Sequence, residues 1–328
     1  MKESIHPPAI VQTDISTRRR AAIWLLFVTL IWGGTFVWMK KALDSAATHL
    51  EAWDLASVVG FMVLIRFLVA AITLPIFSTR ARIALADRSA WKGGTILGLL
   101  MFGGFLTQML ALNEITPAVS AFLTSLYVVF TALIGLKMKS HPLTTVLVSG
   151  VILATFGAGF IDGPPHLTWG WAELLTVFSA LLFAFHIIFT DSVTKEFDPL
   201  AVTQTSFLVV VIASTLTLIF ALIFTSVEIH ILDLLGLLIE FDVLIWLLLL
   251  GVLGSFVAIM ILNLYQRHLH PVHAAIIYAF EPVWATIYAL AEGLNEATFW
   301  LFIGGGALLI GNILVESGKR ADENQESE

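Results

Sequence analysis

Residues 266–284, QRHLHPVHAAIIYAFEPVW, place a carboxylate and a proline side by side inside an apolar run of helical length. An acidic side chain at the depth of a bilayer is costly, so it normally faces other protein or a water-filled cavity and marks a functional site. Proline removes a backbone donor and bends a helix, which membrane helices tolerate where neighbouring groups satisfy the freed carbonyl. Glu281 and Pro282 therefore indicate a helix with a functional role, around which the other helices are arranged.

The composition is that of a polytopic membrane protein. Of the 328 residues, 58% are hydrophobic and only 12% are charged, and the mean hydropathy is +0.93, values outside the range of soluble domains of this size. The absence of cysteine excludes disulfides, thiolate metal sites and cysteine nucleophiles. The net charge of −7 comes from dispersed acids and the C-terminal tail. We expect an all-α protein in a lipid bilayer, with no metal, cofactor or nucleic-acid partner.

Ten transmembrane helices are predicted between two tails, residues 1–20 and 318–328, if each span takes about 20 apolar residues. The expected spans are residues 22–41, 55–78, 93–112, 117–136, 143–161, 170–190, 200–224, 243–264, 271–291 and 298–316. Between the seventh and eighth spans, residues 226–241 form either a short helix on the membrane interface or an extension of a neighbouring span.

The loop charges predict the orientation of these helices. Of the 17 Lys and Arg residues, 14 lie in the two tails and the even-numbered loops. The odd-numbered loops carry acids instead, among them Asp162, Glu228 and Glu292. Because cytoplasmic loops of membrane proteins are enriched in Lys and Arg, both termini are expected in the cytoplasm, as an even number of spans requires.

An internal repeat divides the chain into two five-helix units, residues 21–161 and 169–317. A shift of 154 residues aligns 93–161 with 247–315 without a gap, and proline and glycine recur at matched positions. The informative pairs are Pro117 with Pro271, Gly150 with Gly304, and Gly157 with Gly311. Because five is odd, the second unit is inverted relative to the first. Secondary transporters are typically built this way and bind substrate where the repeats meet.

Several short motifs occur in a specific order along these helices. They are Trp32 to Phe36 followed by Lys40, Arg66-Phe67, Ala111-Leu112 with Pro117 to Phe122, and Gln266-Arg267 through Pro271, Ala275 and Glu281-Pro282. Their order and spacing resemble the EamA-like family of the drug/metabolite transporter superfamily over about residues 20–318. The resemblance implies transport of small metabolites, often amino acids and often outward, through a cavity lined mainly by helices 1, 3, 4, 6, 8 and 9.

The chain departs from the family pattern in the fourth helix. Family members often have a proline at the position of Val128, and an acidic residue near the end of the helix where this chain has Lys137 and Lys139. These departures leave the expected fold unchanged, but they make the two halves less alike. No substrate is therefore transferred from the resemblance.

Two symmetry-related helices carry polar stripes that predict a shared cavity. Ser120, Thr124 and Tyr127 lie on one face of the fourth helix. The equivalent residues of the ninth helix are Ala274, Tyr278 and Glu281. The alternative for Ser120 and Thr124 is that their hydroxyls bond only to the carbonyls of their own helix.

Glu281 has three possible roles. It can bind a substrate ammonium, titrate as a proton-coupling carboxylate, or neutralise a fixed positive charge. Arg66 is the natural partner for the third role, because it is the other charged residue near the middle of its helix. A structural Arg66–Glu281 pair, a direct role of Glu281 in binding or coupling, and separate polar partners for the two residues all stay open.

Other polar and aromatic residues within the spans complete the predicted cavity. His186 of the sixth helix matches Thr35 of the first, and an imidazole suits a proton or ligand switch, although a hydrogen-bonded packing role is the alternative. Gln108 and Asn263 either reach the cavity or join helices. Trp32 and Trp284 are expected to form aromatic walls.

Small residues predict where two further helices make close contact. Gly150, Ala154 and Ala158 recur at a spacing of four in the fifth helix, and Ala307 and Gly311 do so in the tenth. Such patterns permit close packing of helices, either inside one protomer or between two. The sequence is therefore compatible with a monomer or a homodimer.

The function predicted from these features is a secondary transporter or facilitator in the inner membrane. It would move small polar metabolites, amino acids or related compounds, in the outward direction, with protons as an open coupling ion. No nucleotide-binding loop of the form Gly-x4-Gly-Lys-Ser/Thr is present, and no catalytic residue is expected. The alternative is a membrane enzyme or carrier for lipid-linked substrates, with His268, His270 and His273 clustered at one membrane face.

Overall fold

A computed structural model describes residues 15–137, 144–160, 170–269, 274 and 277–326 of the chain. Regular structure in these ranges is helical throughout. The first half contains α1 (Ile15–His49), α2 (Leu55–Phe77), α3 (Thr79–Ile83), η1 (Ala84–Ala86), α4 (Arg88–Ala111), α5 (Pro117–Thr124), α6 (Tyr127–Lys137) and α7 (Thr145–Phe160). The second half contains α8 (Trp171–Glu196), α9 (Pro199–Phe224), α10 (Ile231–Gly236), α11 (Phe241–Leu249), η2 (Leu250–Val257), α12 (Ala258–Tyr265), η3 (Gln266–His268), α14 (Glu281–Ala291) and α15 (Phe299–Glu326).

The apolar segments confirm a polytopic helical protein. Seven segments of the described residues are long and apolar enough to cross a membrane, and two shorter apolar helices cover Thr145–Ala158 and Phe299–Val315. Together they fall on every predicted span except the ninth, residues 271–291, which is described only in part. Residues 226–241 contain the separate short helix α10, rather than an extension of either neighbouring span.

Local sequence signals explain several of the helix starts. Asp54 precedes α2 and accepts a hydrogen bond from the Ser57 amide at 2.9 Å. Asp198 precedes α9 and accepts from two amides of its first turn, with Pro199 following it. Side chains of this kind satisfy amides that have no partner at a helix start, and proline is tolerated there because its missing amide is not needed.

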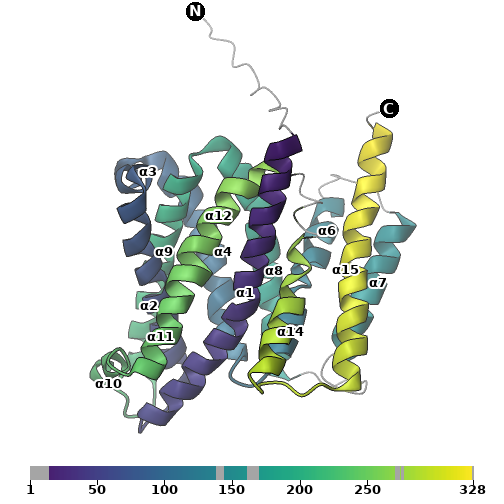
Figure 1. Cartoon of the computed structure of the whole chain (residues 1–328). Helices are drawn as coiled ribbons and strands as arrows, with labels where there is room; N and C mark the ends of the chain where they lie inside the picture. The colour runs from purple at the N-terminus through teal and green to yellow at the C-terminus, as the bar shows by residue number, and fades with distance from the viewer. Residues whose placement is uncertain (1–14, 138–143, 161–169, 270–273, 275–276, 327–328) are drawn as a thin grey trace, which may run out of the picture.

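The start of α1 and the end of α15 lie at the same end of the helical bundle, the upper end in Figure 1. The opposite end, called the lower end here, holds the end of α1, α10, the start of α11 and the connection from α14 to α15. This arrangement is consistent with an even number of crossings.

The fourth and ninth predicted helices are both interrupted. A turn at residues 125–126 separates α5 from α6, and a turn at residues 279–280 precedes α14. The second turn is displaced from the first by the 154 residues of the internal repeat. The expectation of continuous helices, the ninth merely bent at Pro282, is therefore wrong. Pro282 instead lies in the first turn of α14, where proline breaks no helical hydrogen bond.

Buried side chains form hydrogen bonds at the first of these interruptions, the turn at residues 125–126. The Ser125 hydroxyl donates to the Phe122 carbonyl at 2.7 Å. Asn312 of α15 donates from Nδ2 to Ser125 Oγ at 3.1 Å. Non-helical backbone is tolerated inside a membrane protein when it is buried in protein with its polar groups paired. Asn312 supplies one of these partners at the turn.

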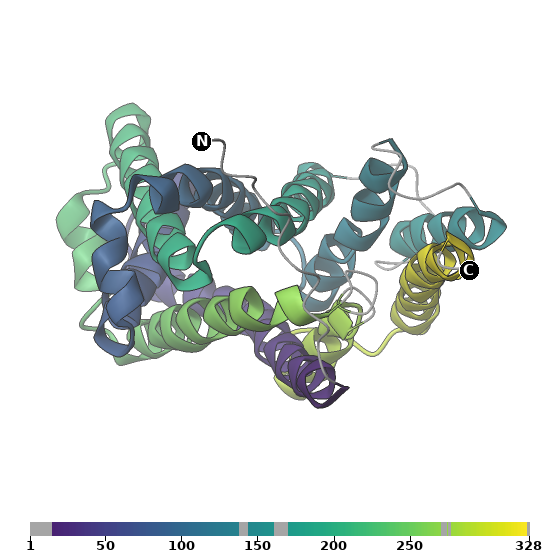
Figure 2. The same cartoon turned by 90° about the horizontal axis from the view of Figure 1, so that it is seen from above.

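Helices α7 and α15 form a closely packed pair on one side of the bundle (Figure 2). A Cβ atom added at Gly157 would lie 2.4 Å from the Leu308 amide, and one at Gly311 would lie 2.4 Å from the Ala154 amide. Glycine is required at such close approaches of two backbones. The small residues of the fifth and tenth predicted helices thus serve packing inside the protomer.

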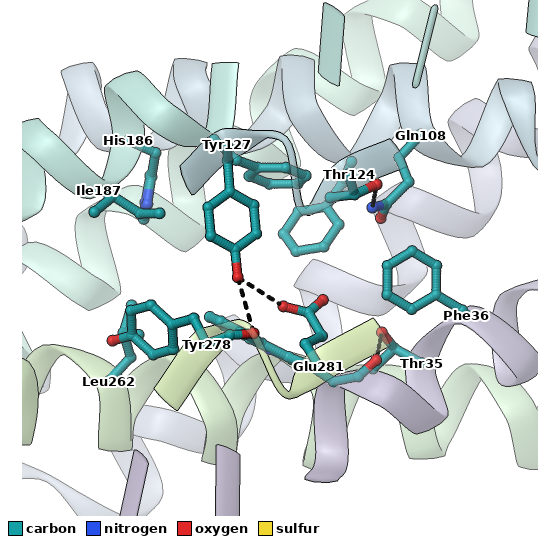
Figure 3. A pocket seen from close by; sticks show the side chains of 13 residues that line it. Thr35, Phe36, Gln108, Thr124, Tyr127, His186, Ile187, Leu262, Tyr278 and Glu281 are labelled. Carbon is teal, nitrogen blue, oxygen red and sulfur yellow. Dashed lines mark hydrogen bonds between the residues drawn. The ribbon is translucent and has the colours of Figure 1, made fainter. Parts of the chain in front are cut away.

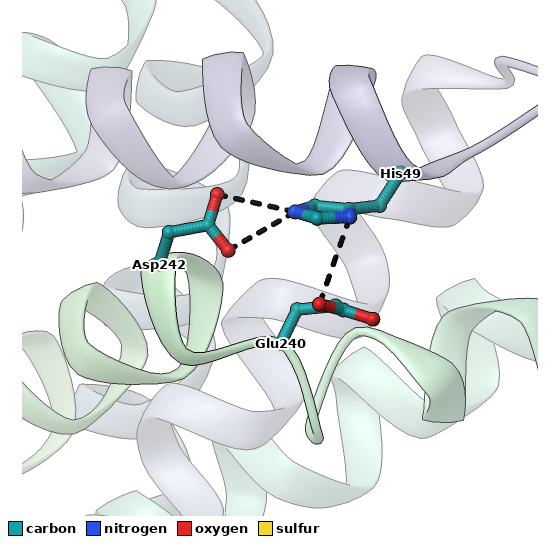
Figure 4. A group of neighbouring side chains, drawn as sticks. All are labelled: His49, Glu240 and Asp242. Atoms are coloured by element: carbon teal, nitrogen blue, oxygen red, sulfur yellow. Dashed lines mark hydrogen bonds and ion pairs between the residues drawn. The ribbon is translucent and has the colours of Figure 1, made fainter.

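Polar contacts join the two halves at the lower end. Lys41 of α1 pairs with Glu292 after α14, and Asn295 donates to Thr116 Oγ1 at 2.8 Å. His49 lies between two carboxylates, with Nε2 at 3.0 Å from Asp242 and Nδ1 at 3.7 Å from Glu240 (Figure 4). These contacts connect helix ends that are far apart in the sequence and hold the two halves together at the lower end.

Candidate functional site

A cavity lies where the interrupted helices meet α1, α4, α8 and α12. The empty space between its walls is about 540 Å³, a value that includes open solvent at its mouth. The 13 lining residues are Trp32, Thr35, Phe36, Phe105, Gln108, Thr124, Tyr127, Phe183, His186, Ile187, Leu262, Tyr278 and Glu281. Eight of these are predicted from the sequence: Trp32, Thr35, Gln108, Thr124, Tyr127, His186, Tyr278 and Glu281.

Tyr127 and Glu281 face each other across this cavity from the two interrupted helices (Figure 3). Each is the first residue of its half-helix, α6 or α14. The Tyr127 hydroxyl lies 3.4 Å from Glu281 Oε2 and 3.3 Å from the Tyr278 carbonyl oxygen, so it can donate to either. The internal repeat thus places a phenol opposite a carboxylate.

The Glu281 carboxylate is almost fully buried, with 8% of the residue exposed. Its position in the first turn of α14 offers one source of stabilisation, because the positive end of the helix dipole lies there. The hydroxyl of Tyr127 offers a second. Neither supplies a full countercharge, so the carboxylate is disposed to attract a cationic group into the cavity.

Arg66 does not pair with Glu281 in this structure. Across the described ranges no carboxylate lies within ion-pair distance of its guanidinium. Arg66 Nε donates instead to Ser255 Oγ at 2.7 Å, and the guanidinium lies over the Phe105 ring at 4.1 Å from its centroid. Of the alternatives left open by the sequence, the structure shows separate polar and aromatic partners for Arg66.

Tyr278 and Trp32 form part of the cavity wall between the two halves. The Tyr278 hydroxyl donates to Gln266 Oε1 at 2.9 Å. The Trp32 ring lies 6.3 Å from the Tyr278 ring, and its indole donates to the Gly254 carbonyl at 3.2 Å. The sequence marks Gln266 only as part of a motif, and its role in orienting Tyr278 is a finding of the structure.

Three further predicted residues reach the cavity in different ways. Gln108 donates from Nε2 to Thr124 Oγ1 at 3.1 Å, which joins α4 to α5. His186 Nδ1 lies 3.4 Å from Thr190 Oγ1, and its Nε2 has no hydrogen-bond partner among the described residues. Thr35 donates to the Trp32 carbonyl of its own helix at 2.7 Å.

Asn263 and Trp284 lie outside the cavity wall. Asn263 donates to Thr203 Oγ1 of α9 at 2.6 Å, so it joins two helices, the second of its two predicted roles. Trp284 packs against α1, where a Cβ atom added at Gly33 would lie 2.5 Å from Trp284 Cβ. The sequence does not predict the apolar wall residues Phe36, Phe105, Phe183, Ile187 and Leu262, because an apolar residue in an apolar span gives no signal.

His268 and His49 do not line the cavity. Of the three histidines predicted at one membrane face, His268 lies in η3, and His270 and His273 lie outside the described residues. His49, Glu240 and Asp242 are close enough together to hold a metal ion, and they lie at the lower end. Without an ion, His49 contacts Asp242 through Nε2 and Glu240 through Nδ1.

Comparisons with known proteins agree with this architecture. A family model described as the EamA-like transporter family matches the chain twice, over residues 19–161 and 170–317. An uncharacterized transporter of Archaeoglobus fulgidus is 27% identical over 302 residues, which cover 91% of this chain and 86% of the relative. A solved structure titled only as the crystal structure of a protein superposes with a TM-score of 0.56 at 17% identity, over 90% of this chain and 98% of that one. The last of these supports the fold alone.

Proposed function

The chain belongs to the EamA-like transporter family, and from this premise we propose that it is a secondary transporter or facilitator that exports small polar metabolites, amino acids or related compounds. Its site is the cavity between the interrupted helices. It resides in the inner membrane, with the upper end of the bundle in the cytoplasm.

The observation that carries this proposal is the carboxylate of Glu281 in the wall of the cavity. It is buried, and the side chain that donates to it among the described residues is a neutral phenol. A substrate ammonium that enters the cavity would supply the missing countercharge and could share the Tyr127 hydroxyl. A proton on Glu281 would serve the same purpose between substrates, which makes this residue the natural place for proton coupling.

The shape of the molecule supports alternating access as the transport cycle. Inverted-repeat transporters bind substrate beside broken helices and rock one repeat against the other. Here the two interruptions flank the cavity, and the contacts Lys41–Glu292, Asn295–Thr116 and His49–Asp242 join the two halves at the lower end. Opening to that side would require these contacts to break, while those of Tyr127 and Glu281 rearrange around the substrate.

Reconstitution into proteoliposomes tests this function. Purified full-length protein is assayed for counterflow of labelled amino acids, amines and nucleobases, with protein-free liposomes as the control. We expect saturable counterflow of at least one compound that carries an ammonium group, and its loss in Glu281→Gln. Saturable counterflow of none of these compounds would contradict the proposal.

A further inference from the structure

Arg66 is a buried cation without a countercharge in the part of the chain that the structure describes. The residue is 1% exposed, and its Nη2 atom has no hydrogen-bond partner among the described residues. Nε donates to Ser255 Oγ, and Nη1 approaches the weak acceptor Met39 Sδ at 3.5 Å. Both acceptors are neutral. An ion pair, by contrast, normally compensates the loss of hydration when a guanidinium is buried.

Aromatic rings compensate only part of this cost. The guanidinium lies 4.1 Å from the centroid of the Phe105 ring and 5.5 Å from that of Phe67. Such cation–π contacts are worth on the order of 2 kcal/mol when desolvated, which is less than the penalty of several kcal/mol for a buried ion. An anion at Arg66 would offset the cost of burial that remains.

The residues around Arg66 also form one end of the cavity. Phe105 covers the guanidinium on one side and lines the cavity on the other. Thr35 is a second wall residue. A Cβ atom added at Gly254 would lie 2.7 Å from Thr35 Cγ2 and 3.5 Å from Arg66 Nη2. One layer of side chains thus separates the guanidinium from the cavity.

The backbone beside Arg66 has an unusual form. Ser255 and Gly254 belong to η2, a π-helical segment between α11 and α12. This segment presents the Ser255 hydroxyl to Arg66 and brings the Gly254 backbone between Arg66 and Thr35. π-Helical turns often occur at functional sites. Here the turn holds the hydrogen-bond acceptor of Arg66, the buried cation at this end of the cavity among the described residues.

We propose that Arg66 is an anion-binding subsite of the cavity, which takes the carboxylate of a substrate whose ammonium group lies at Glu281. The Phe105 ring is the side chain that moves aside when this carboxylate approaches. The planar guanidinium, already oriented by Ser255, would then donate from Nη2 to the carboxylate. This inference rests on the proposed transport function and narrows its substrates to those that carry both charges.

The test compares amino acids with amines that lack only the carboxylate. Binding to purified full-length protein in detergent is measured by titration calorimetry for three pairs: leucine and isopentylamine, phenylalanine and phenethylamine, and lysine and cadaverine. We expect the amino acid of at least one pair to bind about 10- to 100-fold more tightly than its amine, the range of a charge-assisted hydrogen bond. This comparison needs only the wild-type protein, so it does not depend on the folding of a variant.

Two variants locate the effect. Arg66→Gln is expected to bring the amino acid of that pair to the affinity of its amine, while the affinity for the amine stays within a few-fold. Arg80→Gln removes an exposed arginine that pairs with Asp198, and it is the matched control that should retain the preference.

The outcomes separate this inference from the proposed function. Equal affinity for both members of every pair that binds overturns the Arg66 subsite and leaves transport of amines intact. Amine binding that strengthens with added chloride, without a preference for the amino acid, assigns the site to a free anion and also overturns the inference. Binding of neither member of any pair contradicts the proposed function as well.

Discussion

The hydroxyl of Tyr127 lies 3.4 Å from Glu281 Oε2, and the two residues are 154 positions apart, the offset of the internal repeat. Each begins a half-helix after an interruption of its span. The contact therefore joins equivalent points of the two halves at the centre of the cavity. Both halves have the backbone interruption, but the side chains that follow it differ. The first half contributes the neutral donor Tyr127, and the second contributes the carboxylate of Glu281.

Tyr127→Phe removes this donor without changing the shape of the ring. We expect the KM for an ammonium-bearing substrate in counterflow to change by about 3- to 10-fold, the value of one hydrogen bond of roughly 1 kcal/mol. Tyr288→Phe, which removes a hydroxyl from α14 outside the cavity wall, is the control. An unchanged KM in Tyr127→Phe would show that the contact plays no part in binding.

Gly157→Ala tests the packing of α7 against α15. The added methyl would lie 2.4 Å from the Leu308 amide and 2.5 Å from the Gly304 carbonyl oxygen, both backbone atoms that cannot rotate away. Overpacking of this kind costs about 1–3 kcal/mol, so we expect a lower melting temperature in detergent. Gly306→Ala meets nothing within 4 Å and is the matched control. Equal melting temperatures for the two variants would contradict the close contact.

A cross-link tests whether the lower end must open during transport. The chain contains no cysteine, so the double variant Lys41→Cys/Glu292→Cys introduces two thiols at contacting side chains and nowhere else. A short bifunctional thiosulfonate should join them and stop counterflow, and a reductant should restore it. Each single cysteine variant treated in the same way controls for labelling alone. Full activity of the cross-linked protein would mean that this end stays closed throughout the cycle.

The sequence predicts those residues of the site that are polar and lie in apolar spans. The cost of burying Glu281, His186 or Gln108 makes such residues conspicuous, and the repeat offset by itself relates Tyr127 to Glu281. Polarity does not reveal which neighbour a side chain faces. Asn263 is therefore indistinguishable in sequence from a cavity residue, although it bonds to Thr203.

The helix interruptions could not be predicted in the same way. Residues 125–126 and 279–280 are Ser, Leu, Ala and Phe, none of which breaks a helix by itself. The first interruption is supported by Asn312, which is distant in sequence. The same limit applies to the partner of Arg66. Ser255 lies in a π-helical turn that packs against α2, and the two are far apart in the sequence.

The central claim is that Glu281 binds the ammonium group of the substrate, and counterflow by Glu281→Gln tests it most directly. Glutamine keeps the size of the side chain and a hydrogen-bond acceptor but removes the charge. With a counterflow substrate of the wild-type protein, measured between about pH 5 and about pH 8, we expect the variant to lose at least about 100-fold in kcat/KM at every pH while its melting temperature is retained. Wild-type kcat/KM in a folded Glu281→Gln protein would contradict the account.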